Sequence, residues 1–338
     1  MSASRAGRRA AAAVVTGVVT VALGALGVTQ SPAAEAGPIT GPGAQKGITH
    51  SATLVTTGSG KCLDADGTRL RIRPCTGNPH QAWTLPGAGT SPPGPAAVKK
   101  GVSTWEFPGL AGAITDVRAS WYYNWGTNND KMPAGAEFVP MIWDENVVTA
   151  ANLAKVKTEG STLLGFNEPD LDGQAEMDVK QALDLWPQLQ ATGMRLGSPA
   201  VAYGGDTPGG WLDQFMKGAE ERKLKVDFIT LHWYGSDFSD AATGQFMGYV
   251  KAVHDRYQKP IWVTEYGLMN FTGTPRFPST AQITSFIRNS TAQLQAAPYV
   301  ERYAWFSLPA VGDSVDYGLY RDATTPTEAG KAYRAAGS

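Results

Sequence analysis

From residue 98 to the end of the chain, short hydrophobic runs alternate with polar stretches. Each run is rich in Val, Ile, Trp, Tyr or Phe, the residues that favour strands. Eight strands are therefore predicted, over residues 100–107, 118–125, 137–143, 162–167, 195–202, 227–234, 261–265 and 302–308.

Helices are predicted between the later strands, because apolar residues recur there at three- and four-residue spacing. Four such stretches stand out, over residues 147–159, 211–219, 246–257 and 279–287. Gly160 is suited to follow the last turn of the first helix, and Ser279 is suited to cap the start of the fourth.

Eight strands alternating with helices over about 240 residues are typical of a (β/α)8 TIM barrel in the α/β class. An open, doubly wound sheet is the alternative. The connections after the first two strands hold only about ten residues, which is short for a crossover helix. We therefore expect shortened early crossovers.

The first residues have the three-part layout of a secretory signal peptide. Residues 1–9 carry three arginines and no acid, residues 10–28 are apolar, and a small-residue pattern ends at Ala36. We expect cleavage after Ala36, or else after Ala33, and a secreted, extracellular protein. An uncleaved membrane anchor is the alternative; no later stretch is apolar enough to span a membrane.

A small unit lies between the signal peptide and the barrel. Residues 37–47 read as a Gly/Pro-rich tether, 48–86 as a β-rich unit with both cysteines, and 87–97 as a Pro/Gly linker. In an oxidising compartment Cys62 and Cys75 would form a disulfide that staples the unit.

Composition narrows the function classes. Charged residues make up 17% of the chain and the formal net charge is −1, so we expect no nucleic-acid or membrane partner. The spacing of the two cysteines and four histidines offers no zinc motif, and we expect neither a metal nor another cofactor. The protein is expected to be a monomer.

Two glutamates stand at predicted strand ends. Glu168 lies in an Asn-Glu-Pro triplet after the fourth strand, and Glu265 in Thr-Glu-Tyr-Gly at the end of the seventh. In a TIM barrel the carboxyl ends of the strands form the active site, and these two strands face each other across its mouth. Paired carboxyl groups suit glycoside hydrolysis, in which one protonates the leaving oxygen and the other attacks the anomeric carbon.

The neighbours of the two glutamates fit this interpretation. Pro169 favours an extended backbone at Glu168, and Asn167 can bond a sugar hydroxyl. His232 and Tyr234 end the strand next to that of Glu265, where either side chain could hold this carboxylate ionised. Asp170 reads as a structural acid of the following loop.

Aromatic residues gather in or just after the predicted strands, where they could stack on sugar rings. The candidate substrate-binding aromatics are Trp121, Tyr123, Trp143, Tyr203, Trp233, Tyr234, Tyr266 and Trp305. Trp105 and Trp125 lie there too. Since side chains on a strand alternate between faces, about half of the set should pack in the barrel instead. Trp143, Trp233 and Trp305 are the first choices.

Residues 98–338 resemble glycoside hydrolase family 128 of clan A, the glycosyl hydrolase catalytic core proteins. The resemblance rests on Lys100-Gly-Val-Ser, Ser120-Trp-Tyr-Tyr-Asn-Trp125, Phe138-Val-Pro-Met-Ile-Trp143, Leu164-Gly-Phe-Asn-Glu-Pro-Asp170, Gly197-Ser-Pro-Ala200, Phe228-Ile-Thr-Leu-His-Trp-Tyr234, Trp262-Val-Thr-Glu-Tyr-Gly267, Tyr303-Ala-Trp-Phe306 and Thr327-Glu-Ala-Gly-Lys-Ala-Tyr333.

This resemblance implies endo-hydrolysis of the polysaccharide β-1,3-glucan with retention of configuration. It implies Glu168 as acid/base and Glu265 as nucleophile. A retaining pair should have its carboxyl groups about 5–5.5 Å apart, an inverting pair about 6.5–9.5 Å. The alternatives are a retaining glycosidase for another linkage (β-1,4 or β-1,6 glucan, or mannan) and a non-catalytic glucan-binding protein.

The small unit resembles a single, partial ricin B-type lectin repeat. It opens with Gly60-Lys-Cys-Leu-Asp64 and closes with Gln81-Ala-Trp83. The resemblance implies Asp64 and Asn78 as candidate sugar ligands. The alternative is a disulfide-stapled remnant without sugar binding, because one repeat of this size can hardly bury a core of its own.

Overall fold

The structure is a computed structural model. It describes residues 99–130, 136–310 and 317–337, and the short segments 50–52, 62–66, 69–74 and 83–85. The chain divides into two compact units, Met1–Ala97 and Val98–Ser338. Within the described residues no helix has the length and apolar character to cross a bilayer. The predicted signal peptide, residues 1–36, lies outside them.

The small unit contains two antiparallel strand pairs among its described segments. Strand β1 (His50–Ala52) pairs with β4 (Trp83–Leu85), and β2 (Cys62–Asp66) pairs with β3 (Arg69–Arg73). Asp64 is buried. Cys75 and Asn78 lie outside the described residues, so the Cys62–Cys75 disulfide and the lectin-like sugar site remain predictions.

In the large unit, every predicted strand segment contains or overlaps a strand. The strands are β5 (Lys100–Ser103), β6 (Trp121–Tyr123), β7 (Glu137–Phe138), β8 (Thr162–Leu163), β9 (Arg195–Leu196), β10 (Ile229–Gly235), β11 (Ile261–Leu268) and β12 (Val300–Trp305). Several are shorter than predicted because the residues beyond them pair only through isolated bridges.

The strand ladders of the large unit are parallel. Six strands pair in the order β10-β11-β12-β5-β6-β7, and β8 pairs with β9. Parallel bridges from Met141 to Leu164 and from Gly197 to Phe228 connect the two groups. Each strand is thus paired with the next along the chain, and β12 is paired with β5. The fold is α/β, with a parallel sheet and helices.

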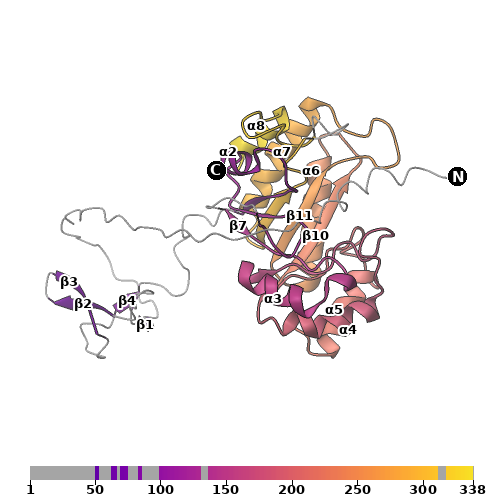
Figure 1. Cartoon of the computed structure of the whole chain (residues 1–338). Helices are drawn as coiled ribbons and strands as arrows, with labels where there is room; N and C mark the ends of the chain where they lie inside the picture. Colours follow the sequence, from indigo (N-terminus) through magenta and orange to yellow (C-terminus); the bar gives the residue numbers. More distant parts are fainter. Residues whose placement is uncertain are drawn as a thin grey trace. The chain divides into compact units, whose positions relative to one another are not determined.

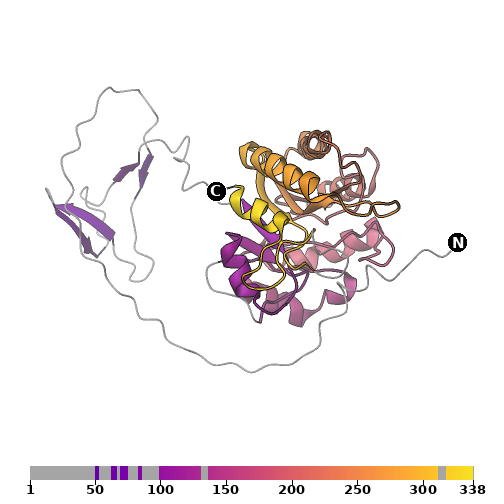
Figure 2. The ribbon, with the colours of Figure 1, turned by 90° about the horizontal axis from the view of Figure 1, so that it is seen from above.

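Helices follow most strands and pack around them (Figures 1 and 2). They are α2 (Leu110–Asp116), the 3-10 turn η2 (Glu145–Val147), α3 (Ala150–Glu159), α4 (Val179–Gln190), α5 (Trp211–Glu221), α6 (Ala242–Tyr257), α7 (Thr280–Ala296) and α8 (Glu328–Ala335). The first crossover holds only the seven-residue α2. The second shows no helix in its described residues, 124–130 and 136. The early crossovers are short, as predicted.

Local signals explain several helix ends. Ser279 caps the start of α7, as predicted, and it forms a capping box with Gln282. Helix α3 ends at Glu159, as predicted, but Gly160 is extended (φ 178°) rather than left-handed. Any residue can adopt that conformation, so a Gly C-cap is not what ends α3.

Two hydrophobic clusters form the core of the large unit. One lies between strands and helices and includes Trp186, Tyr266 and Trp305. The other contains no helix residue and gathers side chains from the opposite face of the strands; its members are Trp121, Tyr123, Val139, Met141, Leu164, Phe228, Trp262 and Ala304. Alternation along each strand therefore supplies two separate packed layers.

Candidate active site

Glu168 lies at a corner where the chain leaves β8. The N–H of Asn167 donates to the carbonyl of Trp143 (2.9 Å), and the N–H of Glu168 donates to the carbonyl of Ala200 (2.7 Å). The φ of Glu168 is 44°, in the left-handed region. The extended backbone predicted from Pro169 is therefore wrong, because these tertiary hydrogen bonds outweigh the local preference. Such strain in a non-glycine residue is concentrated at functional sites.

Glu265 reaches the same place through a β-bulge. Leu231 of β10 pairs with Val263 of β11, but the next residue, His232, pairs with Glu265. Thr264 is thus an extra residue on β11, and its carbonyl accepts a hydrogen bond from the hydroxyl of Tyr123 (3.1 Å). The bulge places Glu265 beside His232 on one face of the sheet.

His232 lies between the two glutamates. Its Nδ1 is 3.0 Å from Oε1 of Glu168, and its Nε2 is 3.6 Å from Oε1 of Glu265. The imidazole is 1% exposed, and Glu168 and Glu265 are 8% and 6% exposed. One carboxyl oxygen of each glutamate and a ring nitrogen of His232 lie within 4.8 Å of one another. The structure therefore brings the two candidate glutamates together, as predicted.

Three further donors surround the carboxyl group of Glu265. Its Oε1 accepts from the indole N–H of Trp125 (2.8 Å) and the hydroxyl of Tyr123 (3.1 Å). Its Oε2 accepts from the hydroxyl of Tyr234 (2.5 Å). Burial raises the pKa of both tyrosines well above the usual value, so they remain protonated donors at neutral pH.

The charges of the buried groups are coupled. Burial raises the pKa of Glu265, and the positive field of His232 and the hydrogen bonds from Tyr234 and Trp125 act against this rise. Burial lowers the pKa of His232, but the carboxylates of Glu265 and Glu168 outweigh it, so the imidazole pKa is raised. The proton on the imidazole and the negative charge on the glutamates thus stabilise each other.

Asn167 is buried beside Glu168. Its Nδ2 donates to Oε1 of Gln174 (3.1 Å), in a loop that folds back so that the N–H of Ala175 meets the carbonyl of Asn167 (3.0 Å). Its Oδ1 is buried without a hydrogen-bond partner. A buried acceptor of this kind needs a donor, and a sugar hydroxyl is one that can supply it.

The cluster of Glu168, His232 and Glu265 has spacings that could also hold a metal ion. The hydrogen bonds that neighbouring side chains donate to Glu265 argue against metal binding. The oxygens of Glu265 already accept from Tyr123, Trp125 and Tyr234, and metal ligands need lone pairs that are free. The arrangement is better suited to transferring protons and to attack by a carboxylate.

Comparison with known proteins agrees with this geometry. The family model described as "Glycosyl hydrolase catalytic core" matches residues 111–333. A family 128, subgroup I, endo-β-1,3-glucanase from Amycolatopsis mediterranei, solved with laminaritriose, is 58% identical, with a TM-score of 0.68 over 70% of this chain and 99% of that one. The chain belongs to glycoside hydrolase family 128. It is a glycoside hydrolase.

Two more distant relatives are also similar to this chain. A subgroup II endo-β-1,3-glucanase from Sorangium cellulosum is 30% identical, with a TM-score of 0.59 over 70% of this chain and 98% of that one. The "Alkali-sensitive linkage protein 1" of Schizosaccharomyces pombe (strain 972 / ATCC 24843) is 33% identical over 56% of this chain. The match covers 34% of that protein, so the chain spans about a third of its length.

Family 128 structures include variants of the A. mediterranei enzyme in which one of two glutamates is replaced, bound to laminari-oligosaccharides. The two replaced glutamates are separated along their chain by the same number of residues as Glu168 and Glu265. The pair that the sequence singled out thus has the spacing of the pair studied in that relative.

Some predicted aromatics reach the site. Tyr123 and Tyr234 bond Glu265 directly. Trp143 is half-buried, and its carbonyl holds the backbone of Asn167. Tyr203 is 63% exposed and lies in the loop after β9. Its ring is therefore free to meet a ligand.

Four other predicted aromatics pack elsewhere. Trp233 packs on Phe246 of α6 and Phe286 of α7, because it alternates with His232 and Tyr234 on β10 and faces the helices. Tyr266 and Trp305 are fully buried in the same helix-facing layer. Trp121 is buried against Trp262, and its indole donates to the carbonyl of Lys99 at the start of β5 (3.0 Å). None of these four contacts the glutamates.

Trp125 contacts Glu265 but is not among the predicted substrate-binding aromatics. It lies two residues beyond β6 with φ 59°. The sequence places Trp125 with the other aromatics at the end of a predicted strand. Strand alternation, however, does not predict that its indole turns back to Glu265. Only the left-handed backbone at this position decides that.

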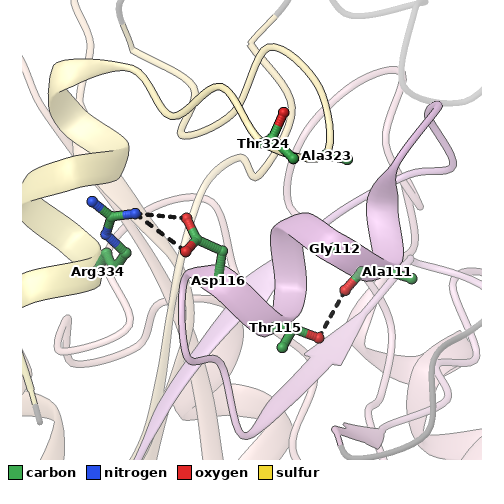
Figure 3. Close-up of a pocket in the computed structure, with 7 residues that line it drawn as sticks. All are labelled: Ala111, Gly112, Thr115, Asp116, Ala323, Thr324 and Arg334. Carbon is green, nitrogen blue, oxygen red and sulfur yellow. Dashed lines mark hydrogen bonds and ion pairs between the residues drawn. The ribbon is translucent and has the colours of Figure 1, made fainter.

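Two surface hollows of about 560 Å³ lie apart from the glutamates. Figure 3 shows one, between α2 and α8, where Arg334 donates to both oxygens of Asp116 (3.2 and 2.9 Å). The other is lined by α5 and α6 residues, among them Asp213 and Arg256. Neither contains an aromatic ring next to a pair of carboxyl groups, so neither competes as the site of hydrolysis.

Proposed function

We propose that this chain is a secreted, retaining endo-β-1,3-glucanase, with Glu168 as acid/base and Glu265 as nucleophile. The observation that carries the proposal is the approach of the two carboxyl groups to within 4.8 Å. This spacing is shorter than the about 6.5–9.5 Å of inverting pairs and is in line with the shorter separation of retaining pairs, about 5–5.5 Å.

In the first step, a carboxylate oxygen of Glu265 forms a bond to the anomeric carbon while the glycosidic C–O bond breaks. Glu168 gives its proton to the leaving oxygen. In the second step, Glu168 takes a proton from water as the water oxygen attacks the anomeric carbon and releases Glu265. Each step inverts the anomeric carbon, so the product keeps the substrate's configuration.

The surroundings support this division of roles. Glu265 accepts three hydrogen bonds from Tyr123, Trp125 and Tyr234, which favour its charged form. Among the described residues, the carboxyl group of Glu168 has one hydrogen-bond contact, with Nδ1 of His232. Because His232 lies between the two glutamates, it can couple a change of charge at one carboxyl group to the other.

The substrate class is argued from the relatives. The A. mediterranei enzyme, described as an endo-β-1,3-glucanase, was solved with laminaritriose. A relative from Blastomyces gilchristii, 28% identical over 72% of this chain, is a curdlan-specific exo-β-1,3-glucanase in complex with glucose. The higher identity to the endo-acting enzyme favours internal cleavage. Another linkage stays an alternative, because the shape of the sugar subsites sets it.

The remaining expectations belong to the same proposal. The cyclic pairing of eight parallel strands supports a (β/α)8 barrel. The layout of residues 1–36 supports secretion. In the oxidising environment outside the cell, Cys62 and Cys75 would pair.

The test is to incubate the mature protein with a panel of linkage-defined glucans and to follow the anomeric protons of the first products by NMR. We expect short β-1,3-linked oligosaccharides released first as the β-anomer. Release of the α-anomer first would refute retention. Cleavage of a β-1,4, β-1,6 or mannan substrate alone would refute the linkage, and no cleavage of any glycan would favour a glucan-binding protein.

A further inference from the structure

We infer that Trp125 is a positioning residue for Glu265: with Tyr123 it anchors Oε1, so that Oε2 is the oxygen that attacks the sugar. The inference rests on the proposed function and adds to it the identity of the attacking atom and the residue that selects it.

The hydrogen bonds to Glu265 are unequal at its two oxygens. Oε1 accepts from Trp125 (2.8 Å) and Tyr123 (3.1 Å), and His232 Nε2 lies 3.6 Å away. Among the described residues, Oε2 accepts from Tyr234 only (2.5 Å). A carboxylate oxygen offers about two lone-pair directions. The described donors take both directions at Oε1 and leave one open at Oε2.

The backbone of Trp125 is built for this contact. Two residues after β6, its φ of 59° is unusual for a bulky side chain. Asn124 supports the turn, since its Oδ1 accepts from the N–H of Gly126 (3.0 Å). The carbonyl of Gly126 in turn accepts from the N–H of Met141 (2.9 Å). The strain is held by these bonds, and its result is an indole N–H aimed at Glu265.

Ring packing keeps the indole from rotating away. The ring centroid of Trp125 lies 5.1 Å from that of Tyr123, 5.9 Å from that of Phe306 and 6.3 Å from that of Trp105. The first two contacts are edge-to-face, a favourable geometry for aromatic pairs. Trp125 is thus held on several sides, and a positioning role requires such rigidity.

The attacking step balances with Oε2 as nucleophile. A lone pair of Oε2 forms the bond to the anomeric carbon, the bond from that carbon to the glycosidic oxygen breaks, and the proton of Glu168 goes to that oxygen. Trp125 and Tyr123 stay on Oε1, which becomes the carbonyl oxygen of the ester and still accepts hydrogen bonds.

The direct test is the structure of the enzyme trapped with 2-deoxy-2-fluoro-β-laminaribiosyl fluoride, whose ester to the nucleophile hydrolyses slowly. We expect a covalent bond through Oε2, with Trp125 Nε1 still on Oε1. An ester through Oε1 would overturn the inference and leave the proposed function intact. If active enzyme forms no ester to Glu265, the proposed retaining mechanism fails, and the inference fails with it.

The kinetic test uses W125F, which keeps an aromatic ring and removes the N–H. Loss of a hydrogen bond to a charged group should lower kcat about 10- to 100-fold with little change in KM. The acid limb of the pH profile should move to higher pH, because Glu265 loses a donor that favours its charged form. This limb also reflects the other groups around Glu265: His232, Tyr234, Tyr123, Glu168 and Tyr317.

A matched control is W186F. The indole of Trp186 also donates an N–H over 2.8 Å, but to the carbonyl of Lys225, so this variant should keep the wild-type pH profile. Y123F removes the other donor to Oε1 and should shift the profile in the same direction as W125F. An unshifted acid limb in folded W125F, or in folded Y123F if W125F does not fold, would contradict a positioning role.

Discussion

At the scale of single residues, the site depends on conformations that local preference opposes. Glu168 and Trp125 have φ values of 44° and 59°, in a region that favours glycine. Each is held there by hydrogen bonds to other strand ends. The strain places a carboxyl group and an indole where extended backbone would not take them, and the rest of the fold compensates for its cost.

The roles of the two glutamates lead to distinct mutant behaviour. E168Q keeps the shape of the side chain and removes the proton donor, so turnover on laminarin should fall by roughly 10²–10⁴. E265A removes the nucleophile and should abolish formation of the covalent intermediate. Added azide should then replace the missing carboxylate and give an inverted product. Steady-state hydrolysis and product NMR check both variants. Wild-type turnover in either would refute the site.

The free energy of unfolding should fall as pH rises through the range in which the buried side chains of Glu265 and His232 titrate. The pKa of Glu265 is raised from 4.5 by burial, and that of His232 is raised above 6.5 by the two carboxylates, which outweigh its burial. The folded state therefore binds more protons than the unfolded chain. The contribution of His232 is complete below pH 6.5 and is lost as pH rises through its folded pKa.

Urea unfolding at a series of pH values measures this effect. In H232N the decline of the free energy of unfolding over this pH range should be weaker. H254N is the control, because His254 contacts the carbonyl of Lys259 rather than a carboxylate. Equal pH dependence in wild type and H232N would contradict the coupling.

At the scale of elements, two consecutive lysines at the start of β5 bind the ends of two helices. The ammonium group of Lys99 contacts carbonyls at the end of α7, including that of Ala297 (2.8 Å). That of Lys100 contacts carbonyls at the end of α8, including that of Ala336 (2.7 Å). A positive charge suits the C-terminus of a helix. The start of β5, the first strand of the large unit, thereby connects α7 and α8 to the sheet.

Replacing Lys100 should destabilise the fold without changing the chemistry. Lys100 is 1% exposed, and burial lowers its pKa to about 8, with the charge of Arg118 adding to the effect. K100M would leave buried carbonyls without donors, at about 1–3 kcal/mol of unfolding free energy. K99M should cost less, because water can reach its half-buried site. Thermal unfolding and kcat measure the two effects; a larger loss in K99M would contradict this account.

At the scale of the whole molecule, the chain divides into two compact units, and the candidate site lies in one of them. Glu168, Glu265 and the side chains that contact them all belong to the unit Val98–Ser338. The small unit, Met1–Ala97, contributes none of the contacts described for the site. Hydrolysis should therefore be a property of the large unit.

Deleting residues 37–97 should spare activity on soluble laminarin. We expect kcat and KM within about twofold of those of the full chain, since every contact described for the site lies within the large unit. Rate measurements on both proteins check this. Circular dichroism controls for folding. A collapse of soluble activity in a folded deletion variant would mean that the small unit forms part of the site.

The sequence pattern predicted the strands well because a buried strand is marked by a short local run of hydrophobic residues. It also predicted that Glu168, Glu265, His232 and Tyr234 lie close together, since side chains at the carboxyl ends of neighbouring parallel strands meet at one edge of the sheet. It failed for Trp233, Tyr266 and Trp305, which were assigned to the ligand and lie in the helix-facing layer. Nearness to a strand end does not say which face a side chain takes.

The chain's own residues thus determined the class of fold and pointed to the acidic pair and its proposed chemistry, because periodicity and residue type act over short distances. The tertiary structure decided the rest: the bulge at Thr264, the left-handed corners at Glu168 and Trp125, and the unequal donors on Glu265. These features depend on hydrogen bonds between strands far apart in the sequence. No local pattern contains such bonds, and they can form only once the strands have paired.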